Sequence, residues 1–117
     1  MARRITIHGI KNCDTMKKAF RWLDERGTPY SFHDYKKQGV TEQMLRGWSK
    51  LAGWEKLLNK AGTTFRKLPD SDKQGLDETS AIALMVQHPG MIKRPVLDVD
   101  GTLLVGFKAE AYEEMLG

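Results

Sequence analysis

The sequence predicts an α/β domain built on a mixed four-stranded sheet, and three stretches support that prediction. Residues 4–8 alternate isoleucine with polar side chains, as a half-buried strand does, and residues 16–23 repeat apolar side chains at helical spacing. Residues 30–35 indicate a second strand. A strand, a helix and a strand so close together form a right-handed unit with parallel strands. Asp100-Gly101 between two apolar runs instead predicts an antiparallel hairpin.

The middle of the chain is predicted to be helical. Thr41 is suited to cap a helix that runs to about Ala52, because its hydroxyl can accept a hydrogen bond from the first turn. Apolar residues at helical spacing predict the buried stripe of this helix, which consists of Met44, Leu45, Trp48 and Leu51. A short helix is expected to follow over residues 54–60.

Residues 62–68 are predicted to form a loop, and Pro69 marks its end. The apolar run further on predicts another helix, which starts at Asp77 or at Thr79 and reaches Gln87. Both Asp77 and Thr79 are suited to cap a helix, so the sequence leaves the two starts open.

Strands over residues 95–99 and 102–105 and a helix over residues 108–116 complete the predicted order. A βαβ half followed by a ββα half is the thioredoxin-like pattern, with a mixed four-stranded sheet. The helices at about residues 41–90 then form an insertion between the two halves. We expect residues 1–117 to form one domain, since no linker or low-complexity segment interrupts them.

Length and composition narrow the class of protein. The 117 residues suffice for one core, and no run has the ~18 apolar residues of a membrane helix. No targeting signal opens the chain and its single cysteine rules out an internal disulfide, so we expect a protein of the reducing cytoplasm. The net charge of +4 is spread out, so nucleic acid is not an expected partner. No metal site is expected, because His33 and His88 lack ligand spacing.

Cys13 is expected where the first strand gives way to the first helix. Unpaired N–H groups and the helix dipole favour an anion there, and a thiolate is such an anion. Lys11, Lys17 and Lys18 add positive charge nearby, which suits a small anionic thiol or oxyanion. A lone cysteine is also common as a small buried hydrophobe, so position alone leaves both interpretations open.

Six short motifs occur in order along nearly the whole chain. They are residues 9–15 (GIKNCDT), 54–59 (WEKLLN), 62–68 (GTTFRKL), 88–90 (HPG), 92–95 (IKRP) and 105–107 (VGF). With these motifs the chain resembles the thioredoxin-like arsenate reductase and Spx family, and most closely its YffB-like branch.

The resemblance implies a redox role for Cys13 and an anion-binding role for Arg94. It also implies a cis peptide bond before Pro95, beside the cysteine. By the same resemblance, Arg66 is expected to be a second basic residue of the anion-binding pocket. The remaining residues expected in the substrate or glutathione site are Lys11, Asn12 and Thr15.

The sequence departs from the arsenate reductases in two respects. Those enzymes use three arginines around the oxyanion, whereas Asn59 and Gly106 stand in two of the places and only Arg94 is in position. Their histidine that supports the thiolate lies four residues before the cysteine, which is Gly9 here. His8 is one residue away, and a one-residue slip on a strand reverses the face, so its help to the thiolate stays open.

The expected function is that of a monothiol reductase in which Cys13 attacks a mixed or glutathionylated disulfide, since members of the YffB-like branch are proposed glutathione-dependent thiol reductases. Glutathione is then the co-substrate, held by Arg94 with Arg66 or Lys11, and a protein disulfide is a second candidate substrate. With no second cysteine, an outside thiol must resolve the intermediate. We expect a monomer.

Two alternatives stay open. One is glutathione-linked arsenate reduction, which the two missing arginines weaken. The other is a regulator that, like Spx, binds RNA polymerase. Spx proteins typically switch through Cys-x-x-Cys, whereas Met16 occupies the second position here, which argues against a disulfide switch but not against binding.

Overall fold

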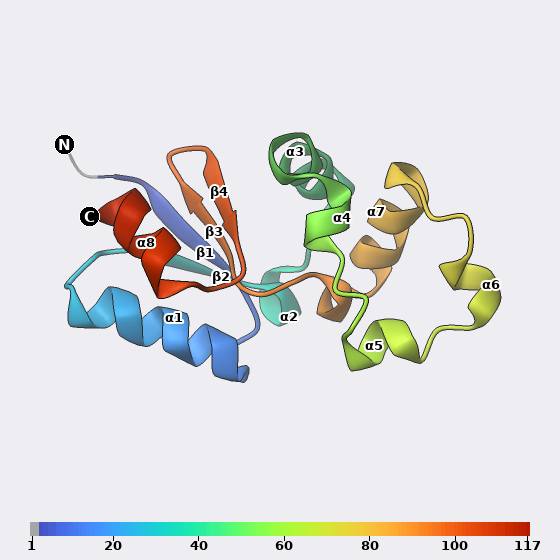
Figure 1. The fold of residues 1–117 in the computed structure, drawn as a ribbon, viewed down its shortest axis with the longest axis horizontal. Helices are drawn as coiled ribbons and strands as arrows, with labels where there is room; N and C mark the ends of the chain where they lie inside the picture. The colour runs from blue at the N-terminus through green and yellow to red at the C-terminus, as the bar shows by residue number, and fades with distance from the viewer. Residues whose placement is uncertain (1–2) are drawn as a thin grey trace. The chain divides into compact units, whose positions relative to one another are not determined.

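The computed structural model describes residues 3–117, which divide into two units (Figure 1). The first joins the described residues up to Gln38 with Arg94–Gly117, and the second is Gly39–Lys93. That residues 1–117 act as one domain with an insertion at about 41–90 stays a prediction. None of the helices in the described part of the chain has the length and apolar character of a membrane span.

The first unit is built on a four-stranded sheet with the strand order β2-β1-β3-β4. The central strand β1 (Ile5–Gly9) pairs in parallel with β2 (Ser31–Asp34) and antiparallel with β3 (Val96–Val99). An antiparallel hairpin joins β3 to β4 (Thr102–Val105). The predicted mixed sheet is confirmed. Tyr35, predicted in the second strand, instead opens the short helix α2 (Tyr35–Gln38).

The hairpin turn shows why the sequence signal there is strong. Asp100 and Gly101 both adopt positive φ, at 52° and 90°. A two-residue turn of this kind matches the twist of the flanking strands, and aspartate and glycine tolerate its backbone. The Gly101 N–H also donates to the Asp98 carboxylate at 2.7 Å.

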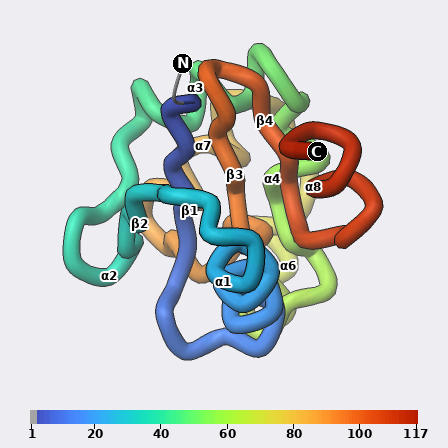
Figure 2. Tube along the Cα trace, turned by 90° about the vertical axis from the view of Figure 1, so that its left-hand side faces the viewer, coloured from blue at the N-terminus to red at the C-terminus, as the bar shows by residue number. Residues whose placement is uncertain are grey.

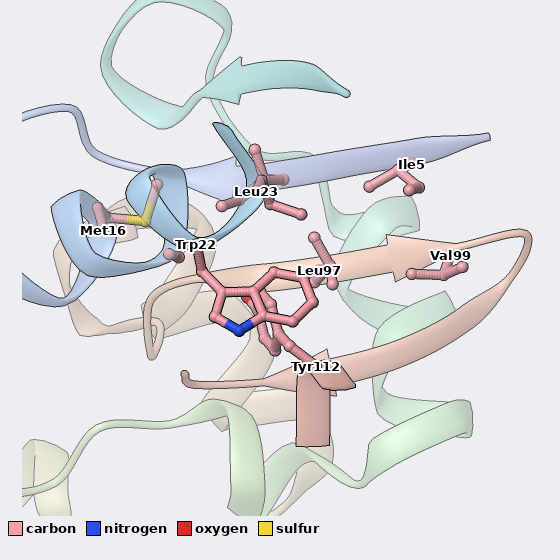
Figure 3. Close-up of a cluster of buried hydrophobic side chains, with 9 residues drawn as sticks. Ile5, Met16, Trp22, Leu23, Leu97, Val99 and Tyr112 are labelled. Carbon is pink, nitrogen blue, oxygen red and sulfur yellow. The ribbon is translucent and has the colours of Figure 1, made fainter. Parts of the chain in front are cut away.

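Two helices, α1 (Asp14–Glu25) and α8 (Ala109–Leu116), contribute to the core on one sheet face. Figure 2 shows α1 in front of neighbouring β1 and β3. The buried side chains in Figure 3 come from α1, α8, β1 and β3, and include Ile5, Met16, Trp22, Leu23, Leu97, Val99 and Tyr112. Fully buried Met16 lies in the first turn of α1, and burial of such a side chain stabilises by ~1.5–3 kcal/mol. Packing therefore anchors the start of this helix.

The second unit consists of helices. In chain order they are α3 (Glu42–Ala52), α4 (Trp54–Leu57), α5 (Thr63–Arg66), α6 (Asp70–Lys73), α7 (Glu78–Gln87) and the 3₁₀ turn η1 (Pro89–Met91). Thr41 caps α3 as predicted, and its hydroxyl accepts from the Met44 N–H at 3.1 Å. Asp77 is the N-cap of α7 and forms a capping box with Ser80, which decides between the two predicted starts.

Some predictions in this unit are wrong. Leu51 is 60% exposed, because it lies at the border of the apolar stripe of α3 rather than inside it. Residues 62–68 are not a loop, since Gly62 is the N-cap of α5 and its carbonyl accepts from the Arg66 N–H at 3.1 Å. The predicted helix over 54–60 ends at Leu57, because Leu58 turns to extended backbone and forms a β-bridge with Ile92.

Candidate active site

Cys13 is the N-cap residue of α1. Its backbone is extended, with φ −145° and ψ 130°, and its carbonyl accepts from the Lys17 N–H at 2.9 Å. The side chain is half-buried and packs against the core on the α1 face. The thiol therefore lies at the positive end of a twelve-residue helix, as the sequence predicted.

The surroundings of Cys13 favour its ionised form. Burial raises the pKa of the thiol, but the N–H groups of Met16 and Thr15 and the Arg94 side chain outweigh that effect. Arg94 acts on the sulfur both as a hydrogen-bond donor and as a positive charge. The pKa of Cys13 is therefore lowered from its ordinary value, which is the condition for an activated nucleophile at neutral pH.

The sheet topology explains how Arg94 reaches Cys13. Gly9 ends β1 opposite Asp34, the last residue of β2, and Val96 begins β3 opposite His8. The chain segments that leave or enter these three strands consequently meet at one edge of the sheet. Arg94 belongs to the segment that enters β3, and Cys13 to the one that leaves β1.

Pro95 lies between Arg94 and β3. Its side chain is buried, and the Arg94–Pro95 peptide bond is cis, as the resemblance implied.

The other predicted binding residues differ in position and exposure. Lys11 and Asn12 are exposed in the segment between β1 and Cys13, and Thr15 is half-buried in the first turn of α1. Arg66 is the exposed last residue of α5 in the second unit, and its carbonyl accepts from Lys73 Nζ at 2.8 Å. A place for Arg66 in the pocket of Cys13 stays a prediction.

His8 points to the sheet face opposite the α1 core. Ile7 is buried in that core, and neighbouring side chains on a strand alternate between faces. His8 Nδ1 donates to the Val96 carbonyl at 2.9 Å, and its ring lies 5.2 Å from that of His33. Burial lowers the pKa of His8, against the opposite effect of the bond to Val96. The structure thus gives His8 contacts on the face away from Cys13.

Gly9 and Met16 fit each other beside the cysteine. A Cβ atom at Gly9 would overlap Met16 Sδ. Any side chain at position 9, where the arsenate reductases carry their histidine, would therefore force the fully buried Met16 to shift. Gly9 and Met16 are thus fitted to each other beside the cysteine.

Sequence reasoning missed Tyr35. This residue directly follows Asp34, the partner of Gly9, so it lies at the same sheet edge as Cys13 and Arg94. Burial raises the pKa of Tyr35, and the positive charge of Arg94 partly offsets the rise. The parallel register of β1 and β2 is the signal that could have found it, since it sets which residue follows β2 at this edge.

Within residues 3–117, no group of three or more histidine, cysteine, aspartate or glutamate side chains is arranged to hold a metal ion.

A model of the family described as the ArsC family matches residues 8–115. An uncharacterized protein of Haemophilus influenzae is 40% identical over 109 residues, which cover 93% of this chain and 96% of that protein. The global transcriptional regulator Spx of Listeria innocua is 22% identical over 114 residues, which cover 96% of this chain and 86% of the regulator. The resemblance found in the motifs is confirmed.

Two solved structures combine close similarity of fold and sequence. The YFFB (PA3664) protein is 54% identical, with a TM-score of 0.94 over 97% of this chain and 99% of that one. An arsenate reductase (ArsC) related protein from Brucella melitensis is also 54% identical, with a TM-score of 0.78 over 97% of this chain and 94% of that one. An arsenate reductase from Vibrio cholerae, at 18% identity and a TM-score of 0.84, shares the fold over 97% of this chain and 98% of that one.

Proposed function

Because this chain belongs to the ArsC family, we propose that it is a glutathione-dependent thiol–disulfide reductase whose nucleophile is Cys13. The observation that supports this most is the half-buried thiol with a lowered pKa beside Arg94. Thiolates, not thiols, attack disulfides, and the fraction of thiolate at neutral pH limits the rate. We further propose that the protein acts in the reducing cytoplasm as a single-domain monomer.

The reaction takes two exchanges at sulfur. The Cys13 thiolate attacks the glutathione sulfur of a mixed disulfide between glutathione and a protein or small thiol. A Cys13–glutathione disulfide forms, and the other thiol leaves as a thiolate that takes a proton from water. A second glutathione, as thiolate, then attacks the bound glutathione sulfur. It releases the Cys13 thiolate and glutathione disulfide, so overall one glutathione thiol is consumed and the mixed disulfide is converted to the free thiol and glutathione disulfide.

The binding residues supply charge and shape. Arg94 favours the Cys13 thiolate in the free enzyme, and in the complex it would hold a glutathione carboxylate, with Arg66 or Lys11 beside it. Asn12, Thr15 and Pro95 would border the tripeptide. Cys13 is the only cysteine, so the second thiol must come from outside the chain.

Mass spectrometry tests the two exchanges directly. Treatment with oxidised glutathione should add one glutathione per chain, at Cys13, and reduced glutathione should then remove it. The Cys13→Ser variant is the control and should gain no adduct. If the wild-type thiol reacts quickly with iodoacetamide but takes up no glutathione, the proposed dependence on glutathione is contradicted.

A non-enzymatic role is the second candidate, because Spx relatives match 96% of the chain. In that role the protein would bind RNA polymerase without a disulfide switch, since Met16 stands where Spx proteins carry a second cysteine. A pull-down against purified polymerase separates the two functions. Glutathione-linked arsenate reduction uses the same Cys13 chemistry, and an arsenate-reduction assay with glutathione distinguishes it.

A further inference from the structure

We propose that the exposed basic residues of α1, which are Lys17, Lys18 and Arg21, bind an acidic segment of a glutathionylated protein beside Cys13. We call these three residues the basic row. The inference rests on the proposed reductase function and adds the class of substrate. That substrate is a protein mixed disulfide whose cysteine has carboxylate side chains close to it in sequence.

The basic row begins next to the thiol. The Lys17 N–H donates to the Cys13 carbonyl at 2.9 Å, so Lys17 lies one helical turn beyond Cys13. Residues four apart on a helix are neighbours on one face, which puts Cys13, Lys17 and Arg21 in line with Lys18 beside them. With a rise of ~1.5 Å per residue, Lys17 and Arg21 lie about 6 Å and about 12 Å from Cys13 along the helix axis.

The charges of the basic row are available to a partner. All three side chains are exposed, and within residues 3–117 none of them forms an ion pair, although Asp14 and Glu25 lie about one turn away. Lys17 and Arg21 are like charges four residues apart, and such a pair destabilises a helix. A partner with carboxylates on this side of α1 would relieve that repulsion.

The helix α3 shows how basic residues are placed when they stabilise the helix itself. Arg46 pairs with Glu42 at 3.3 Å, one turn away, and Lys50 lies in the last turn, where the helix dipole favours a cation. The last turn of α1 has no basic residue, and its two lysines lie nearer the positive end of the dipole. Helix stability therefore does not explain the basic row, whereas an acidic partner does.

An extended peptide matches the spacing of the basic row. Its residues rise by ~3.3 Å each and alternate between two sides, so side chains two and four positions from its cysteine lie about 7 Å and about 13 Å away. Carboxylates at those positions can therefore lie near Lys17 and Arg21 when the disulfide is at Cys13. The partner must be a protein or peptide rather than a nucleic acid, because the mixed disulfide needs a cysteine.

The experiment measures how fast the full-length protein removes glutathione from synthetic peptides. Three peptides share one glutathionylated cysteine and carry glutamate, glutamine or lysine at the second and fourth positions on both sides of it. Each rate is divided by the rate of the same peptide with dithiothreitol, which corrects for the reactivity of the peptide's own disulfide.

The glutamate peptide should react about tenfold faster than the glutamine peptide at low salt, because opposite charges steer association. The lysine peptide should be slower than both. In about 0.5 M NaCl the preference for glutamate should fall below about twofold, since salt screens exposed charges.

Two double variants with the same loss of charge locate the effect. In Lys17→Gln/Arg21→Gln the preference for glutamate over glutamine should fall from about tenfold to about threefold. Because it is a ratio of two peptides, a change in the reactivity of Cys13 itself cancels. Arg3→Gln/Arg4→Gln removes two exposed cations before β1, at the other end of that strand from Cys13, and should keep the full preference. Glutamine is a good helix former, so α1 should fold in the first variant.

Equal rates for the three peptides would overturn the proposal. So would a full preference in Lys17→Gln/Arg21→Gln, or the same loss of preference in both double variants, because net charge alone would then explain the effect. Failure to remove glutathione from any of the peptides would contradict the proposed reductase function itself, and this inference with it.

Discussion

The helices α1 and α3 start with the same backbone but use their first turns differently. Both N-cap residues are extended, Cys13 at φ −145° and Thr41 at φ −99°. The Thr41 hydroxyl accepts from the Met44 N–H, whereas the Cys13 side chain accepts no such capping bond. In α1 the N–H groups of the first turn favour an ionised sulfur instead. Because no capping side chain accepts from them, the N–H groups of the first turn of α1 can stabilise an anion.

What replaces the missing cap is packing. Met16, in the first turn of α1, is fully buried and lies against Gly9. The first turn of α3 instead has exposed Glu42 and half-buried Met44 beside its cap. One helix start is thus held by the core and the other by a hydrogen bond.

Of the predicted changes, replacement of Cys13 should have the largest effect, because it removes what distinguishes the start of α1 from that of α3. Cys13→Ser should abolish glutathione exchange, because a serine hydroxyl is not ionised at neutral pH. At acid pH, where Cys13 is a neutral thiol and its ionisation contributes no stability, the substitution should also stabilise the fold by up to about 1 kcal/mol, since serine is a preferred N-cap. Activity is read by mass spectrometry and stability by urea unfolding. A variant that loses stability would show that the thiol is a structural part of the core.

Arg94→Ala should have the next largest effect. Loss of the guanidinium removes a hydrogen bond and a charge that favour the thiolate, so the pKa of Cys13 should rise by about one unit and alkylation at pH 6 should slow about tenfold. Half-buried Arg94 contributes little to folding, and the urea midpoint should stay nearly constant. Loss of stability, with an unchanged thiol pKa in the fraction that stays folded, would make Arg94 structural.

Gly9→Ala tests the packing that holds α1. The new methyl group would overlap Met16 Sδ, and overpacking of a core costs about 1–3 kcal/mol. The cost should shrink when Met16→Ala is combined with it, because the two sites are in contact. Urea unfolding of the four proteins in this cycle gives the coupling. Strictly additive losses would refute the fit between Gly9 and Met16.

Thr41→Ala should have the smallest effect. Loss of the capping bond at 3.1 Å should lower the free energy of unfolding by about 1 kcal/mol. Alkylation of Cys13 should not change, because the two caps serve different purposes. Thr41→Ser is the control and should retain most of the stability. A change in the pH dependence of Cys13 alkylation in Thr41→Ala would contradict the claim that the two helix starts serve different purposes.

The same comparison explains which predictions from sequence succeed. Asp100-Gly101 and Thr41 are local signals, since the backbone or hydrogen bond that they favour involves their immediate neighbours. Gly62 was misread because glycine both breaks and caps helices, and its sequence alone does not say which. Leu58 leaves its helix for a bridge to Ile92, a partner far along the chain.

In the candidate site, too, some residues follow from short stretches of sequence and others only from the folded structure. Cys13 at a helix start follows from local patterns, and Arg94 from a resemblance in motif. The fit of Gly9 to Met16 and the place of Tyr35 depend on packing and strand register, which no short stretch of sequence encodes. Residues that support a nucleophile are therefore harder to predict than the nucleophile.

The central claim is that the start of α1 ionises Cys13. Since the pKa of Cys13 is lowered in the folded protein, the thiolate stabilises the fold above the unfolded-state pKa, and that contribution is lost as the pH falls through the folded value. The direct measurement is the pH dependence of iodoacetamide alkylation of the wild-type protein, with thiolate absorbance followed in parallel. The account predicts a midpoint below the free-cysteine value of about 8.5. A midpoint at or above that value would contradict it.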